Sequence, residues 1–262
     1  MHICMVAFSD LHFDYRIYRE ATSLHNAGHQ ITIIAAAFHS APLEGWDDFD
    51  IQLIPTDRSR SLRKLYPQFW HRAFPLLLAA KADAYHAHDL DALWPTVRVA
   101  RRLERPLVYD SHEFWIEQSS LVDRPLIRFF WSMLERRLIG QVDRVITVSA
   151  SIAQELKARY ALEEVLVLRN LPLFRERIDS DLIRQTLDLP ADRPIVLYQG
   201  GFLTDNGLSE QIEAAAAFNQ AALVLIGDGP NEAALREQVR ASGLEERVYF
   251  IPRVPFHQHH NY

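Results

Sequence analysis

The fold of this chain is decided by two stretches, Tyr85-His86-Ala87-His88-Asp89-Leu90 and Val108-Tyr109-Asp110-Ser111-His112-Glu113-Phe114. Each stretch begins as a short apolar run, ends in a histidine beside a carboxylate, and is followed by a segment that favours a helix. In an open α/β sheet, the carboxyl ends of the parallel strands form the crevice where ligands bind. The two polar clusters therefore predict one functional site at that crevice.

Strand-like and helix-like segments alternate along the rest of the chain. The first series predicts strands at residues 3–7, 30–36, 51–54, 84–87, 107–109, 145–148 and 165–168, with helices at 15–27, 62–78, 125–139 and 151–159. The second series predicts strands at residues 195–198, 223–226 and 248–251, with helices at 208–219 and 232–241. This alternation is typical of the α/β class, in which helices cover both faces of a parallel sheet.

The segment between the two series is rich in charge and contains two prolines, so it is expected to join two domains. The predicted organisation is an N-terminal Rossmann-like domain at residues 1–170, a linker at 171–191 and a partial C-terminal Rossmann-like domain at 192–262. Three strands are few for an independent open sheet, so the second domain is expected to be incomplete. Its uncovered edge could pair with another chain and form an oligomer.

Composition narrows the classes of function. The chain has 262 residues, 48% of them hydrophobic, and a formal net charge of −6, which argues against general nucleic-acid binding. The single cysteine, Cys4, excludes a disulfide within the chain and fits a reducing compartment. The first residues lack the pattern of a signal peptide, and no apolar run approaches the ~20 residues of a membrane span. A cytoplasmic protein is expected, either free or held peripherally at the inner face of the membrane.

The histidines of the two deciding stretches are the first candidates for a chemical role. At His112, the neighbouring Glu113 could orient or charge an imidazole that bonds a substrate or moves a proton; the alternative is a strand-end histidine bonded to backbone. His86 and His88 point to the same side of a strand and could form part of a metal site, but no third ligand has suitable spacing. Hydrogen bonding to a polar substrate is favoured, and no metal is expected.

The turns after other strands carry further candidates. Asp10, His12, Asp14 and Arg16 follow the first strand, and the absence of glycine there disfavours a nicotinamide dinucleotide. Asp14 could equally be an N-cap. In the second series, Gly200-Gly201 and Gly227-Asp228-Gly229-Pro230 follow strands, where glycines let backbone amides approach a phosphate, although glycine also simply forms tight turns.

Two other groups of residues have both a functional and an ordinary interpretation. Arg58, Arg60, Arg63 and Lys64 precede and begin an aromatic helix that either sits on an anionic membrane or is a core helix with a solvated basic end. His257, His259 and His260 either bind a metal or belong to a frayed terminus.

Several motifs, in their order and spacing, carry a resemblance to a known family. They are Asp14-Tyr15-Arg16 with Glu20-Ala21 and Gly28-His29, His86-Ala87-His88-Asp89, Tyr109-Asp110-Ser111-His112-Glu113, Val142-Asp143-Arg144-Val145-Ile146-Thr147-Val148-Ser149, Arg169-Asn170-Leu171-Pro172, Tyr198-Gln199-Gly200-Gly201, and Leu225-Ile226-Gly227-Asp228-Gly229-Pro230. With them, nearly the whole chain resembles the retaining glycosyltransferases of family 4, which have the GT-B fold of two Rossmann-like domains.

The resemblance implies transfer of a sugar from a nucleotide-diphosphate sugar to a glycan or lipid-linked acceptor. It implies no metal and no other cofactor. His112, with Glu113, would lie near the reacting sugar as the catalytic pair. The acceptor side would be lined by Asp14, Arg16, His88 and Asp89. The donor would be bound by Gly200, Gly201, Gly227, Asp228 and Gly229.

Two departures from the family pattern qualify this expectation. The loop at residues 201–207 has no lysine or arginine, where the family often places a cation for the donor diphosphate. The family also carries two glutamates, seven residues apart, in a region beyond Tyr262, so a truncated form is expected. Two alternatives stay open: a catalytically inactive glycosyltransferase-like binding protein, and a nucleotide-sugar 2-epimerase of the same architecture. The sequence specifies neither the donor sugar and its base nor the acceptor, the linkage or the oligomeric state.

Overall fold

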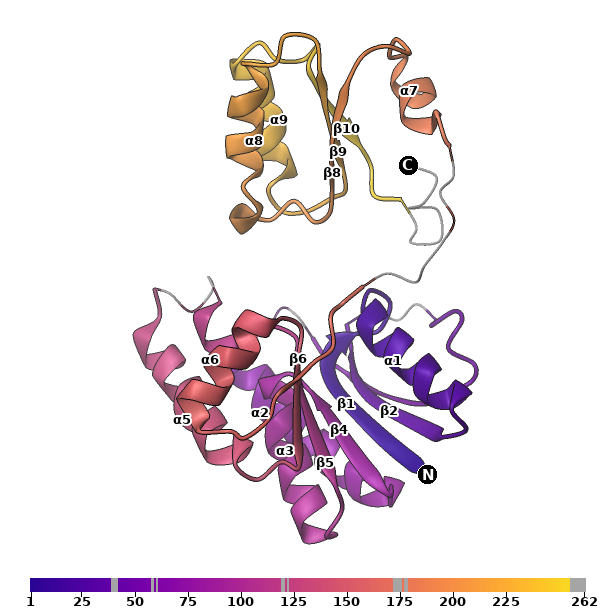
Figure 1. Cartoon of the computed structure of the whole chain (residues 1–262), viewed down its shortest axis with the longest axis vertical. Coiled ribbons are helices and arrows are strands. Elements are labelled where there is room, and N and C mark those ends of the chain that lie inside the picture. The colour runs from indigo at the N-terminus through magenta and orange to yellow at the C-terminus, as the bar shows by residue number, and fades with distance from the viewer. Residues whose placement is uncertain are drawn as a thin grey trace. The chain divides into compact units, whose positions relative to one another are not determined.

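The computed structural model describes residues 1–38, 42–57, 59, 61–118, 121, 123–171, 176 and 179–254. The chain divides into two units, Met1–Pro172 and Leu173–Tyr262, each with a parallel sheet and helices (Figure 1). The expected α/β class is therefore confirmed. No helix in the described ranges has the length and apolar character needed to cross a membrane.

The first unit alternates strands and helices as the sequence predicts. Its strands are β1 (His2–Asp10), β2 (Gln30–Ala37), β3 (Asp50–Pro55), β4 (Ala84–His88), β5 (Leu107–Ser111), β6 (Arg144–Thr147) and β7 (Leu166–Val167). Its helices are α1 (Tyr15–Asn26), α2 (Leu62–Ala80), α3 (Leu90–Arg102), the 3₁₀ turn η1 (Trp115–Glu117), α5 (Pro125–Ile139) and α6 (Ala150–Tyr160). Within the described residues, the 3₁₀ turn η1 follows β5, and the long helix α5 begins later with Pro125 in its first turn.

The order of the strands creates the ligand crevice expected from the sequence. The sheet runs β3-β2-β1-β4-β5-β6-β7 with all neighbours parallel, so the strand order reverses direction between β1 and β4. Ligands bind at such a switch point in open α/β sheets. The register pairs Ala7 with His88 and His88 with Asp110, which places polar residues of neighbouring strands side by side.

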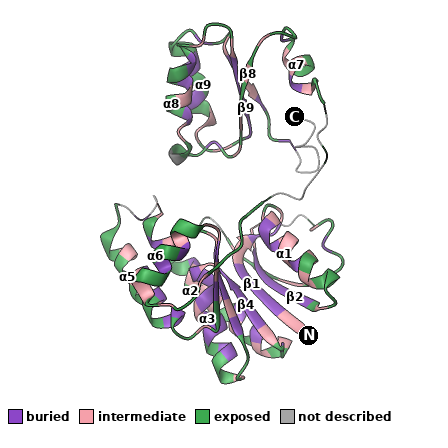
Figure 2. Ribbon diagram, viewed as in Figure 1, coloured by how far each residue is buried: buried purple, intermediate pink, exposed green. Residues whose placement is uncertain are grey.

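The apolar character of the strands follows from burial on both faces (Figure 2). Along β1, Cys4 and Val6 belong to the core cluster that includes residues of α2, α3 and α5, whereas Met5 and Ala7 belong to the cluster that includes α1. Successive side chains of a strand point to opposite faces, so one apolar run supplies both cores.

Helix α1 shows how the first turn of the site is fixed. The side chain of Asp14 accepts a hydrogen bond from the backbone N–H of Ile17 at 3.2 Å, and Ser9 donates to the same carboxylate at 2.6 Å. Gly28, beyond the end of the helix, has a φ of 85°, which favours glycine. The expected N-cap and the expected stop of this helix are both confirmed.

The second unit has a three-stranded parallel sheet in the described residues, in the order β10-β9-β8. Its elements are α7 (Leu182–Leu187), β8 (Ile195–Gln199), the 3₁₀ turn η2 (Thr204–Asn206), α8 (Leu208–Ala215), β9 (Ala222–Ile226), α9 (Glu232–Ala241) and β10 (Val248–Ile251). Helices α8 and α9 share a core with one face of the sheet, and α7 packs with the other. The predicted edge is present at β8, where Val196 and Leu197 are exposed; oligomerisation through it stays a prediction.

Two details of this unit differ from the sequence-based expectation. Helix α7 lies within the segment expected to be a linker, because Ile183 and Leu187 pack against the sheet. Helix α8 ends at Ala215 instead of residue 219. There the guanidinium of Arg247 donates to the carbonyls of Ala216 and Phe218 at 2.9 and 2.8 Å, which satisfies acceptors that a longer helix would have used internally.

Candidate active site

The candidate site lies at the switch point of the seven-stranded sheet. Helix α1, which follows β1, supplies Arg16; β4 supplies His88 and the following Asp89, and β5 supplies Asp110 and the nearby His112. These positions are distant in sequence but adjacent in the strand order. The fold thus assembles one polar cluster from three neighbouring strand ends.

Asp110 is the centre of the cluster. Its side chain is fully buried and forms an ion pair with the Arg16 guanidinium, which is only 5% exposed. Arg16 donates from Nε to Oδ2 at 2.9 Å and from Nη2 to both carboxylate oxygens at 2.8 Å, while its Nη1 donates to the carbonyl of Leu168. This forked pairing fixes the carboxylate and neutralises its charge inside the protein.

Two histidines contact the same carboxylate. His112 Nε2 lies 3.3 Å and His88 Nδ1 3.6 Å from Asp110 Oδ2, and these two ring nitrogens are 3.1 Å apart. Because one of two hydrogen-bonded nitrogens must be the donor, the protonation states of the rings are linked.

Asp89 holds the other side of the His112 ring. Its Oδ1 accepts the backbone N–H of His112 at 2.9 Å, and its Oδ2 lies 3.3 Å from His112 Nδ1. The backbone of Asp89 has a φ of 62°, which is strained for a residue with a side chain. Its own N–H donates to the carbonyl of Asp110 at 2.8 Å, so the neighbouring strand helps to hold this conformation.

These contacts set the charges of the cluster. Burial alone would lower the pKa of His112, but its hydrogen bond with Asp110 and the charge of Asp89 raise it to about 9. Burial lowers the pKa of His88. Burial would raise the pKa of the Asp110 carboxyl, but the hydrogen bonds with His112 and His88 hold it well below its usual range. At neutral pH the cluster therefore contains a charged His112 and a neutral His88.

A second layer lies beneath these groups. Glu20 is 3.0 Å from Arg16 Nε, and His86 Nε2 is 3.8 Å from Glu20 and 4.0 Å from Asp110. Burial and the charge of Asp110 raise the pKa of Glu20 to about 8, and burial lowers the pKa of His86 well below its ordinary value.

Glu20, His86, His88 and Asp110 bring possible ligand atoms within 4.8 Å of one another, which the sequence spacing did not suggest. Arg16 already bonds both oxygens of Asp110 and places its positive charge there. A divalent cation would have to compete with that guanidinium. The expectation that no metal is used stays a prediction.

The structure gathers most, but not all, of the first-unit residues selected from the sequence. Arg16, His88, Asp89 and His112 meet in the cluster, and Asp14 stands beside it as the N-cap of α1. Glu113 is exposed, and no hydrogen bond or ion pair of its carboxylate is recorded within the described ranges. Its backbone carbonyl accepts from the Ser111 hydroxyl at 2.7 Å.

Sequence reasoning did not select Asp110 or Glu20 as site residues. Asp110 lies in an apolar strand and is brought to His88 only by the pairing of β4 with β5. Glu20 follows Arg16 by four residues on α1, the spacing at which helical side chains meet. That spacing was a usable signal for the second residue.

The glycines selected for donor binding pack backbone against backbone. A Cβ on Gly227, whose φ is 154°, would lie 1.9 Å from the carbonyl oxygen of Gly200, and one on Gly229 would lie 2.6 Å from that of Phe202. The amides of Gly200 and Gly227 donate to carbonyls of Ile226 and Ile251 at 3.0 and 3.1 Å. These two amides therefore serve the sheet and its extension, and a role of the loops in phosphate binding stays a prediction.

The structure adds a cation to this end of the second sheet. Arg253 follows β10, and its Nη1 lies 3.6 Å from Asp228 Oδ1. The sequence pattern pointed to the loop after β8 as the place for such a cation, so Arg253 was not expected. Arg58, Arg60, His257, His259 and His260, which were also selected from the sequence, lie outside the described residues.

Comparison with known proteins identifies the class. The family model of Glycosyltransferase Family 4 matches residues 15–170, and the model of Glycosyl transferases group 1 matches residues 179–262. The chain belongs to Glycosyltransferase Family 4. A curated relative, 2-deoxystreptamine N-acetyl-D-glucosaminyltransferase of Streptomyces fradiae, is 27% identical over 69% of this chain and 47% of its own length.

Solved structures show the same fold. Sucrose-phosphate synthase from Thermosynechococcus elongatus has a TM-score of 0.77 at 19% identity, over 100% of this chain and 72% of its own. The Anabaena protein HepE in complex with UDP-glucose has a TM-score of 0.65 at 18% identity, over 97% of this chain and 69% of its own. The expected GT-B-like fold is thereby confirmed. The chain spans less than half the length of the curated relatives it matches.

Proposed function

We propose that this chain supplies the acceptor-side domain and part of the donor domain of a retaining glycosyltransferase. The enzyme moves a sugar from a nucleotide-diphosphate sugar to a hydroxyl of a glycan or lipid-linked acceptor. The observation that carries the proposal is the His112–Asp110–Asp89–His88 cluster at the switch point, within the segment that matches the family. The complex of HepE with UDP-glucose supports the donor class.

The charge of His112 defines its role in this proposal. A pKa of about 9 makes its ring a hydrogen-bond donor at neutral pH instead of a base. Both ring nitrogens face protein groups, so a substrate oxygen must replace one of them. Asp89, 22% exposed, is the partner nearer to solvent, and a substrate hydroxyl can take its place at Nδ1. Asp110 then keeps the ring charged and oriented from Nε2.

The test is a transfer assay with a panel of uridine and guanosine diphosphate sugars, with the donor alone as one arm. We expect His112→Ala to lower turnover by about 10²–10⁴-fold, the usual contribution of a positioned polar or acid–base group. His71→Ala, at an exposed position of α2, is the matched control and should keep wild-type turnover.

The outcomes separate the hypotheses. Near wild-type turnover of His112→Ala would make His112 structural and the proposed site wrong. Epimerised sugar from the donor alone would indicate the 2-epimerase. Nucleotide-sugar binding without transfer would indicate an inactive binding protein.

A further inference from the structure

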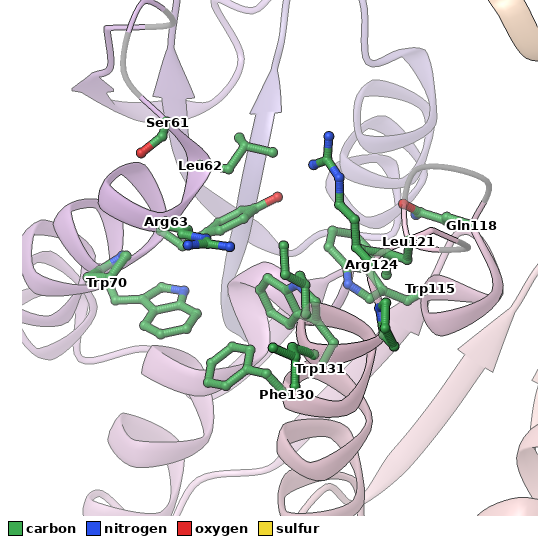
Figure 3. Close-up of a pocket in the computed structure, with 15 residues that line it drawn as sticks. Ser61, Leu62, Arg63, Trp70, Trp115, Gln118, Leu121, Arg124, Phe130 and Trp131 are labelled. Atoms are coloured by element: carbon green, nitrogen blue, oxygen red, sulfur yellow. The ribbon is translucent and has the colours of Figure 1, made fainter.

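The first unit contains an apolar pocket that has no role in the reaction proposed above. It lies between α2 and α5, with η1 in its wall, and has a volume of about 1000 Å³ (Figure 3). This is at the upper end of the ~300–1,000 Å³ common for small-molecule sites. Its walls are mainly aromatic and aliphatic, including Tyr66, Trp70, Trp115, Leu121, Phe130 and Trp131.

The aromatic wall is built before any ligand arrives. Trp131, which is buried, packs against Tyr66, Trp115 and Phe130 with ring centroids 5.0, 5.5 and 5.4 Å apart. Such edge-on contacts hold rings in place. A rigid apolar hollow of this size favours a long hydrocarbon chain over a hydrated sugar, whose hydroxyls would lose their water.

The charged groups that line the pocket are both cations. Arg63, from α2, and Arg124, just before α5, line it from its two sides (Figure 3). Within the described part of the chain, neither guanidinium has a recorded ion pair, and the lining residues include no aspartate or glutamate. The indole Nε1 of Trp115 is buried without a hydrogen-bond partner among the described residues.

The pocket adjoins the candidate active site. Trp115 follows His112 by three residues, and the Trp70 indole N–H donates to the carbonyl of Asp91, two residues after Asp89. Burial raises the pKa of Tyr66, and the charges of Asp91 and Asp89 add to this effect. Tyr66 in the pocket wall therefore lies within electrostatic reach of Asp89 in the cluster. One wall of the pocket therefore contacts the start of α3, directly after Asp89.

We propose that this pocket binds the hydrocarbon chain of a lipid phosphate, with the phosphate between Arg63 and Arg124. This inference rests on the proposed function. The bound lipid phosphate is the acceptor molecule, and the hydroxyl that receives the sugar belongs to it. The acceptor class is then a lipid-linked phosphate instead of a free glycan. The occupant is a single lipid molecule held in a pocket and not a membrane surface spread over α5.

The test measures binding alone, so it does not depend on transfer. Calorimetry of the 262-residue chain uses decyl phosphate below its micellar concentration, with decanol and decyltrimethylammonium as uncharged and cationic counterparts. We expect decyl phosphate to bind and the other two to bind at least about tenfold more weakly, because charge-assisted bonds contribute one to two decades of affinity.

Matched variants locate the site. Phe130→Glu places a charge in the pocket, whereas Phe129→Glu places one on the neighbouring residue of α5, which does not line it; these side chains are 50% and 65% exposed, so folding is spared. We expect the first to weaken decyl phosphate binding at least about tenfold and the second to leave it unchanged. Arg63→Ala with Arg124→Ala should weaken it similarly, while Arg137→Ala, elsewhere on α5, should not.

Each contrary result overturns the proposal. Equal losses from Phe129→Glu and Phe130→Glu would indicate adsorption of lipid on an apolar surface. If decanol binds as tightly as decyl phosphate, the phosphate plays no part in recognition. If decyl phosphate does not bind, the pocket is not a site for a lipid phosphate. The binding assay contains no sugar donor and measures no transfer, so failure of the proposed transfer and failure of this inference are distinguishable.

Discussion

Replacing Asp110 by asparagine tests the electrostatic logic of the cluster most directly. The substitution preserves the shape of the side chain but removes the charge that Arg16 and His112 share. Arg16 is buried, so it would lose its main counter-charge. Breaking a buried ion pair from one side costs about 3–5 kcal/mol. Glu20, 3.0 Å from Arg16, can ionise and compensate in part, so we expect the lower end, about 3 kcal/mol.

The same substitution should discharge His112. Its pKa of about 9 stands above the ordinary 6.5 because Asp110 and Asp89 outweigh burial. Without Asp110, only the charges of Asp89 and Asp14 favour the charged ring against burial, so we expect the pKa of His112 to fall towards its ordinary 6.5. In the wild type, this group contributes stability that is complete below pH 6.5 and is lost as the pH rises through about 9. At about 1.36 kcal/mol per pH unit, the loss over this range is roughly 3 kcal/mol, and Asp110→Asn should not show it.

Urea unfolding followed by tryptophan fluorescence measures the stability, because all five tryptophans, Trp46, Trp70, Trp94, Trp115 and Trp131, belong to the first unit. Histidine titration by NMR, with His112→Ala to assign the signal, measures the pKa. Asp47→Asn, at an exposed position, is the control and should change stability by less than about 0.5 kcal/mol. An unchanged His112 pKa in Asp110→Asn, or a stability equal to that of the control, would refute the reasoning.

Three further predictions concern the framework around the site. Gly229→Ala should speed hydrogen exchange of the β9 and β10 amides because its Cβ would meet the Phe202 backbone at 2.6 Å, whereas Gly140→Ala, with open space around it, should not. Asp14→Ala should lower the free energy of unfolding of the first unit by about 1 kcal/mol through loss of the N-cap, measured by the same urea titration. Burial raises the pKa of the Cys4 thiol to about 12, so a thiol reagent should label it only as fast as the first unit unfolds; rapid labelling under native conditions would contradict this.

The alternation of strands and helices was readable from the sequence because each element carries its own pattern. Buried parallel strands such as β1 and β2 are short apolar runs, and α1 is bounded by a capping aspartate and by Gly28. These signals act over a few residues, so no knowledge of distant contacts is needed. The same local reasoning placed His88, Asp89 and His112 at strand ends. It misjudged α7 and the end of α8, which depend on packing against the sheet and on Arg247.

Tertiary structure decided how the site is charged. Asp110 reads as part of a strand, and only the order of the strands and the reach of α1 place His88, His112 and Arg16 around it. Likewise, the pocket beside the cluster needs α2 and α5, which are far apart in sequence, to face each other. A side chain's pKa and a cavity's shape depend on burial and on neighbours that the whole fold brings together. The sequence therefore determined the helices, the strands and their candidate residues. Only the packed structure determined the chemistry of those residues.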